Sequence, residues 1–374
     1  IGKIMEIFKP YGFDKALFLT TLALITIGLV MVFSSSAQLS HEKYHHLFHF
    51  FINQLTGVCL GILLILLAIP IKKPFYQNFY FIHGLLLISL VLMVLCFLMP
   101  PLAKTNRWVQ FLGFRFQPSE LAKLSLVLFL AYHLDRKKQR LNEYRTFLFP
   151  LAMLFLFLIL IIRQPDYGTA LLLCLISLTV LFIAGVKLKY FLYMGIFSSG
   201  LFLFYLFQAS YRLNRVLSFF DPERDPQGIG FQIIQSKMAV GSGGLVGVSI
   251  GESIQKLFFL PCAHTDYIYA IVGEELGLIG TLAILFLFFI FFWRGLLISQ
   301  KAPNFFTQIV AAGITLTIFF QALLNISVVI GLGPSTGIPL PLISFGRSSL
   351  FCTSLSIGIL LNISQRRAGM QRTQ

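Results

Sequence analysis

Acidic residues are scarce in this chain, and cysteines are scarcer still. Only 14 Asp and Glu residues stand among 374, against 29 Lys and Arg, so the formal net charge is +15. Four of the five cysteines stand singly in apolar runs, where cysteine is usually a small buried hydrophobe, and only Cys262 does not. This pattern excludes a disulfide framework and the spacing typical of a cysteine metal site. The chain also lacks a low-complexity linker and any segment large enough to fold as a separate soluble domain.

Long apolar runs dominate what is present. Apolar residues make up 57% of the chain and charged residues 11%, and runs of membrane-spanning length recur throughout. The sequence predicts an all-α, multi-pass integral membrane protein with a single transmembrane domain over 1–374. We expect about ten transmembrane helices, at roughly 16–38, 48–71, 79–102, 119–134, 147–163, 168–186, 188–207, 266–294, 304–331 and 338–363.

The distribution of lysine and arginine predicts the orientation of these helices. Basic residues gather on one side, and by the positive-inside rule both termini are cytoplasmic. The one large outer loop is then 208–265, between the seventh and eighth helices. Within it, 229–240 has the spacing of a helix lying on the membrane surface, and a second short helix is expected over 253–259. Because topology and anionic lipid account for most of the positive charge, we do not expect nucleic-acid binding.

The stretch from Leu260 to Gly277 holds the most informative carboxylates. Asp266 stands where the outer loop ends and an apolar run begins, and Glu274 and Glu275 follow about two turns later. Carboxylates near or within a membrane are costly and suggest a function. Asp266 could cap the helix that follows. A carboxylate that is partly buried among apolar residues should also have a raised pKa, which suits a general base. The capping role and the role of base can coexist.

Two other motifs place charge beside predicted helix starts. Glu120 and Lys123 are three residues apart on one face of a helix, either as a structural ion pair or with Lys123 adding positive charge to an outward-facing cavity. Asp166 follows Arg163 and Pro165 in a turn between two short helices. It could accept backbone or arginine hydrogen bonds that hold this turn.

The stretch 333–346 is rich in proline and glycine and predicts a stiff outer loop at the membrane edge. Irregular backbone at that depth must be buried in protein or line a water-filled cavity, which fits a transporter gate as well as an enzyme wall. The outer cations Arg107, Arg215 and Lys237 suit an anionic lipid headgroup, because arginine matches phosphate geometry, or they belong to a solvated loop face. The histidines within 41–49 lack carboxylate neighbours apart from Glu42, so no metal is assigned to them.

Together these stretches resemble the SEDS family (shape, elongation, division and sporulation), the FtsW, RodA and SpoVE group. The matching segments run through most of the chain and include Met31–Ser36, Arg107–Trp108, Gln117–Lys123, Gln164–Thr169, Arg215–Leu217, Asp225–Pro226, Gln235–Gly244, His264–Asp266 and Pro339–Ser344. The segments Gln255–Phe258 and Gly273–Gly277 are more similar to the division branch than to the elongation branch.

The resemblance implies a peptidoglycan glycosyltransferase that polymerises lipid II into glycan strands at the outer face of the bacterial cytoplasmic (inner) membrane, at the division site. It implies a class B penicillin-binding transpeptidase and other divisome membrane proteins as partners. The general base falls on Asp266. The candidate substrate-binding residues are Arg107, Lys123, Arg215, Lys237, Glu120, Asp166 and His264. No cofactor is implied; a divalent cation could help to neutralise charge, although the sequence shows no metal site.

Three alternatives remain open: a lipid II flippase, an elongation-type polymerase and a noncatalytic scaffold. The crowding of chemical groups on the outer side favours an enzyme over a flippase, which should need polar groups along a path from both faces. The chain also departs from the family pattern at Cys262, Thr336 and Arg347. Cys262 replaces a usual glutamate, Thr336 removes one phosphate contact, and Arg347 adds a bulky charge where close helix packing or substrate entry is expected.

Overall fold

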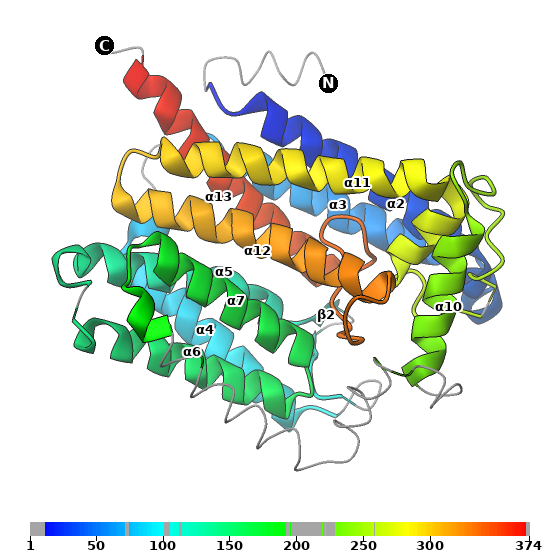
Figure 1. Cartoon of the computed structure of the whole chain (residues 1–374), viewed down its shortest axis with the longest axis horizontal. Coiled ribbons are helices and arrows are strands. Elements are labelled where there is room, and N and C mark those ends of the chain that lie inside the picture. The colour runs from blue at the N-terminus through cyan, green and yellow to red at the C-terminus, as the bar shows by residue number, and fades with distance from the viewer. Residues whose placement is uncertain are drawn as a thin grey trace.

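The computed structural model describes residues 12–71, 75–100, 105–111, 114–141, 143–191, 195, 219, 221, 229–257 and 259–371. The helices are α2 (Lys15–Tyr44), α3 (His49–Ala68), η2 (Phe75–Gln77), α4 (Phe79–Leu98), α5 (Pro118–Arg136), η3 (Lys138–Arg140), α6 (Arg145–Arg163), α7 (Tyr167–Ile183), α10 (Ile229–Ser242), α11 (Ile268–Gln300), α12 (Phe305–Val329) and α13 (Arg347–Gln371). Strands β1 (Val109–Phe111) and β2 (Phe114–Phe116) form an antiparallel hairpin. The long helices run side by side as a bundle, and α10 crosses one end of it (Figure 1).

The described helices confirm an all-α, multi-pass membrane protein. Seven of them, α2, α3, α4, α6, α11, α12 and α13, are long and apolar enough to cross a membrane, and α7 is a shorter apolar helix. Each predicted helix has a counterpart except the one at 188–207, most of which lies outside the described residues. The count of ten therefore stays a prediction. The surface helix predicted at 229–240 corresponds to α10.

The last helix begins later than predicted. It starts at Arg347 rather than at 338, because 334–346 forms an irregular loop. Pro339 and Pro341 have no backbone N–H to donate to a helix, and Gly337 and Leu342 have positive φ angles of 71° and 65°. The irregular loop predicted at 333–346 is therefore present, and the predicted helix overlapped it because Ile338, Leu340 and Leu342 are apolar; all three are buried.

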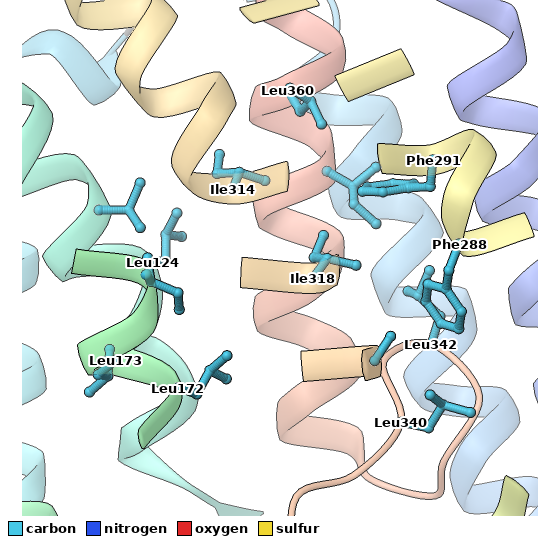
Figure 2. Packing of buried hydrophobic residues seen from close by; sticks show 14 of the residues in the cluster. Leu124, Leu172, Leu173, Phe288, Phe291, Ile314, Ile318, Leu340, Leu342 and Leu360 are labelled. Carbon is cyan, nitrogen blue, oxygen red and sulfur yellow. The ribbon is translucent and has the colours of Figure 1, made fainter. Parts of the chain in front are cut away.

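Helix α12 lies at the centre of the bundle. Figure 2 shows its Ile314 and Ile318 in one buried cluster with Leu124 of α5, Leu360 of α13 and Phe291 of α11. All five side chains are at most 4% exposed. A polar side chain on the inward face of α12 is consequently removed from lipid as well as from water, and it needs a hydrogen-bond partner within the protein.

Glu274 and Glu275 of α11 bind the end of the loop that we predict to lie outside the membrane. Glu275 accepts hydrogen bonds from Ser34 Oγ and from Lys256 Nζ, which is 2.8 Å from Oε1. Glu274 accepts from the hydroxyl of Ser253 and from the backbone N–H of Ile254. The helix predicted at 253–259 is therefore wrong: in its described residues the chain forms turns, because a carboxylate rather than a preceding carbonyl takes these donors.

The opposite end of the bundle joins three helices. Asp14 caps α2, and its carboxylate pairs with Arg294 of α11, with Nη2 and Oδ2 2.6 Å apart. The backbone N–H of Asp14 donates to Ser364 Oγ of α13 at 3.0 Å. The start of α2 and the end of α13 thus lie at one end of the bundle, as the predicted orientation requires (Figure 1).

Candidate active site

Asp266 lies in the turn before α11. The helix begins at Ile268, and its N-cap residue is Tyr267, whose side chain makes no capping hydrogen bond. The capping role considered for Asp266 is therefore wrong. Its backbone carbonyl accepts a hydrogen bond of 2.7 Å from Asn325 Nδ2 in α12. Its carboxylate lies beside Gly337, where an added Cβ would be 3.5 Å from Oδ2.

The surroundings of Asp266 raise the pKa of its carboxylate. Burial raises the pKa of Asp266 to about 6; the Arg107 guanidinium opposes this rise, and the Asp166 carboxylate adds to it. The carboxylate is densely surrounded by protein, although the residue as a whole remains partly exposed. A carboxylate with a pKa near neutral pH can take a proton from a hydroxyl that attacks a carbon centre.

Asp166 holds the turn before α7, as its structural interpretation predicted. Its Oδ1 accepts from the backbone N–H of Thr169 at 3.2 Å and so caps α7. Its Oδ2 accepts from Gln117 Nε2 at 3.1 Å. Asp166 is 2% exposed, so these bonds replace the water that its charge would otherwise need.

Arg107 is the predicted cation that lies close to Asp266 and Asp166. Its Nη1 lies 3.9 Å from Asp166 Oδ1, and its side chain is 26% exposed. Its Nε is buried and makes no hydrogen bond to any described residue. Arg107 thus neutralises part of the charge of two aspartates, and it keeps donor capacity for an anionic ligand.

The loop at 334–346 is fixed by buried side-chain amides. Gln54 of α3 donates to Ser344 O at 3.1 Å, Gln321 of α12 donates to Pro339 O at 2.9 Å, and Asn325 donates to Ile338 O at 2.8 Å. These bonds satisfy backbone carbonyls that no helix or sheet serves. We did not expect these amides from the sequence, although a lone Gln or Asn within an apolar helix is the kind of signal that marks such a site.

Lys123 and Glu120 form the ion pair of the structural interpretation, with Nζ and Oε1 2.8 Å apart, and both are nearly fully buried. Lys123 Nζ also donates to Gln321 Oε1 at 2.6 Å. The pair lines a recess together with Thr317, Thr353 and other residues of α5, α12 and α13. Lys123 therefore reaches the loop at 334–346 through Gln321, and its positive charge is largely neutralised.

The remaining predicted site residues do not join the cluster formed by Asp266, Asp166 and Arg107. The ring of His264 packs on Phe50 and Phe345, with centroids 4.9 Å and 5.7 Å away. Burial first, and the nearby Lys43 second, lower the pKa of His264 to about 4, so it is neutral at pH 7. Lys237 in α10 lies against Gly331, beyond the end of α12. Arg215 lies outside the described residues.

The structure describes all three positions at which the chain departs from the family pattern. Cys262 is exposed and has a positive φ of 58°. Thr336 packs near Gly168, where an added Cβ would be 2.8 Å away from its Cβ. The stem of Arg347 lies over Gly57 of α3, so this charge stands at the seam between α3 and α13. Among the described residues, no group of three or more His, Cys, Asp or Glu could hold a metal ion.

Comparison with known proteins agrees with this architecture. The family model FTSW_RODA_SPOVE, described as "Cell cycle protein", matches residues 15–369. The "Probable peptidoglycan glycosyltransferase FtsW" of Trichlorobacter lovleyi is 38% identical, over 96% of this chain and 94% of that protein. "Stage V sporulation protein E" of Bacillus subtilis is 38% identical, over 94% of this chain and 97% of that protein.

A solved structure extends the likeness to three dimensions. A chain of a peptidoglycan synthase complex, described for the coordination of polymerization and crosslinking, has a TM-score of 0.78 and 27% identity. The match covers 95% of this chain and 98% of that chain. The family match and the relatives' identities each extend over nearly the whole chain. The protein belongs to the FtsW, RodA and SpoVE family of cell cycle proteins.

Proposed function

We propose that this protein is a peptidoglycan glycosyltransferase that polymerises lipid II at the outer face of the cytoplasmic membrane, with Asp266 as the general base. The observation that carries the proposal is the carboxylate of a partly exposed residue whose pKa is raised to about 6 by burial, beside the Arg107 cation. Family membership supports it, because two similar relatives are a named glycosyltransferase and a sporulation protein of the same group.

The chemistry is an inverting displacement. Asp266 takes the proton of the acceptor sugar 4-hydroxyl, and the oxygen forms a bond to the anomeric carbon of the donor. The bond from that carbon to phosphate breaks, and the electron pair leaves with the lipid pyrophosphate. No general acid is required, because pyrophosphate departs without a proton. Arg107 is our first choice for stabilising the departing charge, and Arg215 is a second candidate.

The other predicted residues act around this centre. Lys123 and Glu120 support the loop at 334–346 through Gln321, and Asp166 orients Arg107. His264 offers a neutral ring to the sugar side of the site, and Lys237 a more distant contact for phosphate. A divalent cation could add to charge neutralisation; no step above depends on it.

The division role and the partner are part of the same proposal. We propose a class B penicillin-binding transpeptidase as the partner, since the similar solved chain comes from a complex that couples polymerization to crosslinking. A division-site location, with other divisome membrane proteins, is favoured by the FtsW relatives. The elongation-type polymerase is the nearest alternative, because it shares the chemistry and differs in its partner.

The first test separates polymerisation from transport. The chain and its class B partner are purified, reconstituted in liposomes and supplied with lipid II. Glycan polymer without net translocation of lipid II supports the glycosyltransferase. Translocation without polymer supports the flippase, and neither activity, despite a stable complex with the partner, supports the scaffold.

A further inference from the structure

Asn325 of α12 links Asp266, the proposed base, to the loop at 334–346. It lies in the last turns of α12 and is 2% exposed. Its Nδ2 donates one hydrogen bond to Asp266 O at 2.7 Å and another to Ile338 O at 2.8 Å. One amide group therefore joins two segments that are 72 residues apart in the sequence and that flank the Asp266 carboxylate (266 against 338).

The orientation of this amide follows from its partners. Both are carbonyl oxygens, and an amide turned the other way would place its own oxygen against them without a hydrogen to share. Asn325 Oδ1 is buried and makes no hydrogen bond to any described residue. A buried acceptor without a partner disfavours an asparagine at this position, so what the residue contributes is its two donated bonds.

The second bond restrains the residue next to the carboxylate. Ile338 follows Gly337, whose Cα faces Asp266 Oδ2 and whose φ is 71°. Ile338 also packs on Gly168, two residues after Asp166. Because Asn325 is bonded to both Asp266 and Ile338, it fixes the position of the Asp266 carboxylate relative to the loop at 334–346. It also fixes that position relative to the Asp166 turn, which pairs with Arg107.

We propose that Asn325 is a positioning residue that fixes the Asp266 carboxylate against the loop at 334–346 through these two hydrogen bonds. The proposal rests on the proposed function insofar as Asp266 is the base, but the placement itself can be measured without turnover. A shift of the base by about 1 Å is enough to reduce a rate by roughly a hundredfold.

The charges around Asp266 come from several elements. Arg107, ahead of β1, and Asp166, ahead of α7, both act on its pKa. Within its own turn, the pKa of the Cys262 thiol is raised by burial and then by Asp266. Burial is the largest cause of the raised pKa of Asp266. Loosening the segment should let water in, so we expect this pKa to fall toward the ordinary carboxylate value.

The test replaces Asn325 with leucine, which has a similar shape and no donor. The matched control is Asn362→Leu: Asn362 of α13 is also buried, and it donates to the carbonyls of Ala68 and Ile69 at the other end of the bundle. Titration of the Asp266 carboxylate is followed by infrared difference spectroscopy against Asp266→Asn. Lipid II polymerisation with the partner gives kcat and KM. Asn325→Ser, which keeps at most one bond, serves if the leucine variant does not fold.

For Asn325→Leu we expect the pKa of Asp266 to fall by about one unit, and kcat to fall tenfold or more while KM changes less than twofold. Asn362→Leu should lose thermal stability and change neither. The proposal is overturned if the Asp266 titration in Asn325→Leu or Asn325→Ser matches that in Asn362→Leu. If the wild type makes no polymer, the proposed function fails, and the titration alone decides the positioning role.

Discussion

At the scale of single residues, three carboxylates that we predict to lie on the outer side have three different environments. Asp166 accepts bonds from a backbone N–H and an amide, and Glu275 accepts from Lys256 and Ser34. At Asp266 the Arg107 charge offsets the effect of burial only in part, and burial raises the pKa of this carboxylate to about 6. Hydrogen bonds and opposite charge stabilise an ionised carboxylate, whereas burial destabilises it, and burial is the largest cause at Asp266, which suits this carboxylate to take up a proton near neutral pH.

This difference predicts the pH dependence of polymerisation. A base must be deprotonated to act, so the rate should fall about tenfold per pH unit below pH 6. Arg107 opposes the rise in the pKa of Asp266. In Arg107→Gln the acid limb should therefore move to higher pH, and kcat should fall by about tenfold or more because the departing pyrophosphate loses a cation. The measurement is kcat against pH.

The control for this experiment is Arg163→Gln. Arg163 is an exposed arginine three residues before Asp166, and no described contact joins it to Asp266. Its replacement should leave the acid limb unchanged. An acid limb in Arg107→Gln that stays in place or moves to lower pH would contradict the electrostatic account.

At the scale of elements, the outer loop is bound to α11 by backbone as well as by side chains. Val248 N–H and Ser249 N–H donate to the carbonyls of Glu274 and Glu275. These carbonyls are free because α11 is interrupted at Gly277, which has φ 64° and ψ −162°. A side chain at Gly277 would be strained there and would lie 2.5 Å from Gly247 N.

We predict that the Lys256–Glu275 pair holds this loop closed. Breaking a buried pair by removing one partner costs about 3–5 kcal/mol, because the other charge is left uncompensated. In Glu275→Gln the amides of Val248 and Ser249 should exchange hydrogen roughly a hundredfold faster or more. Arg294→Met breaks the ion pair at the opposite end of the bundle and should not alter their exchange. Equal exchange in wild type and Glu275→Gln would show that the backbone bonds suffice.

Sequence patterns predicted the elements better than the contacts between them. Helical stretches are visible because apolar runs of spanning length are local, and the prolines and glycines of 333–346 predicted an irregular loop for the same reason. Nothing local marks the long-range hydrogen bonds that fix this loop. The Asp166 turn was predictable from Pro165 and the carboxylate beside it. The roles of Gln321 and Asn325 depend on residues more than ten positions away, and single amides in an apolar run do not reveal their partners.

At the scale of the whole molecule, the orientation predicted from basic residues puts the Asp266 turn outside. Cys262 is exposed four residues before Asp266, whereas the other four cysteines lie in α3, α4, α7 and α13. A membrane-impermeant thiol reagent should therefore label Cys262 in intact spheroplasts, and Cys262→Ser should abolish this labelling. Although the residue is exposed, protein atoms around its sulfur desolvate the thiol and raise its pKa, so labelling should speed up at higher pH. Labelling only after permeabilisation would reverse the orientation.

The measurement that tests the central claim most directly compares Asp266→Asn with the wild type. Both are purified with the class B partner and given lipid II at pH 7.5, and Asp135→Asn, an exposed aspartate at the other end of α5, is the control. Relief of a buried charge should leave Asp266→Asn at least as thermally stable as the wild type. We predict polymer from the wild type and from Asp135→Asn, and a loss of at least a hundredfold in Asp266→Asn. Equal polymer from all three folded proteins would contradict the account.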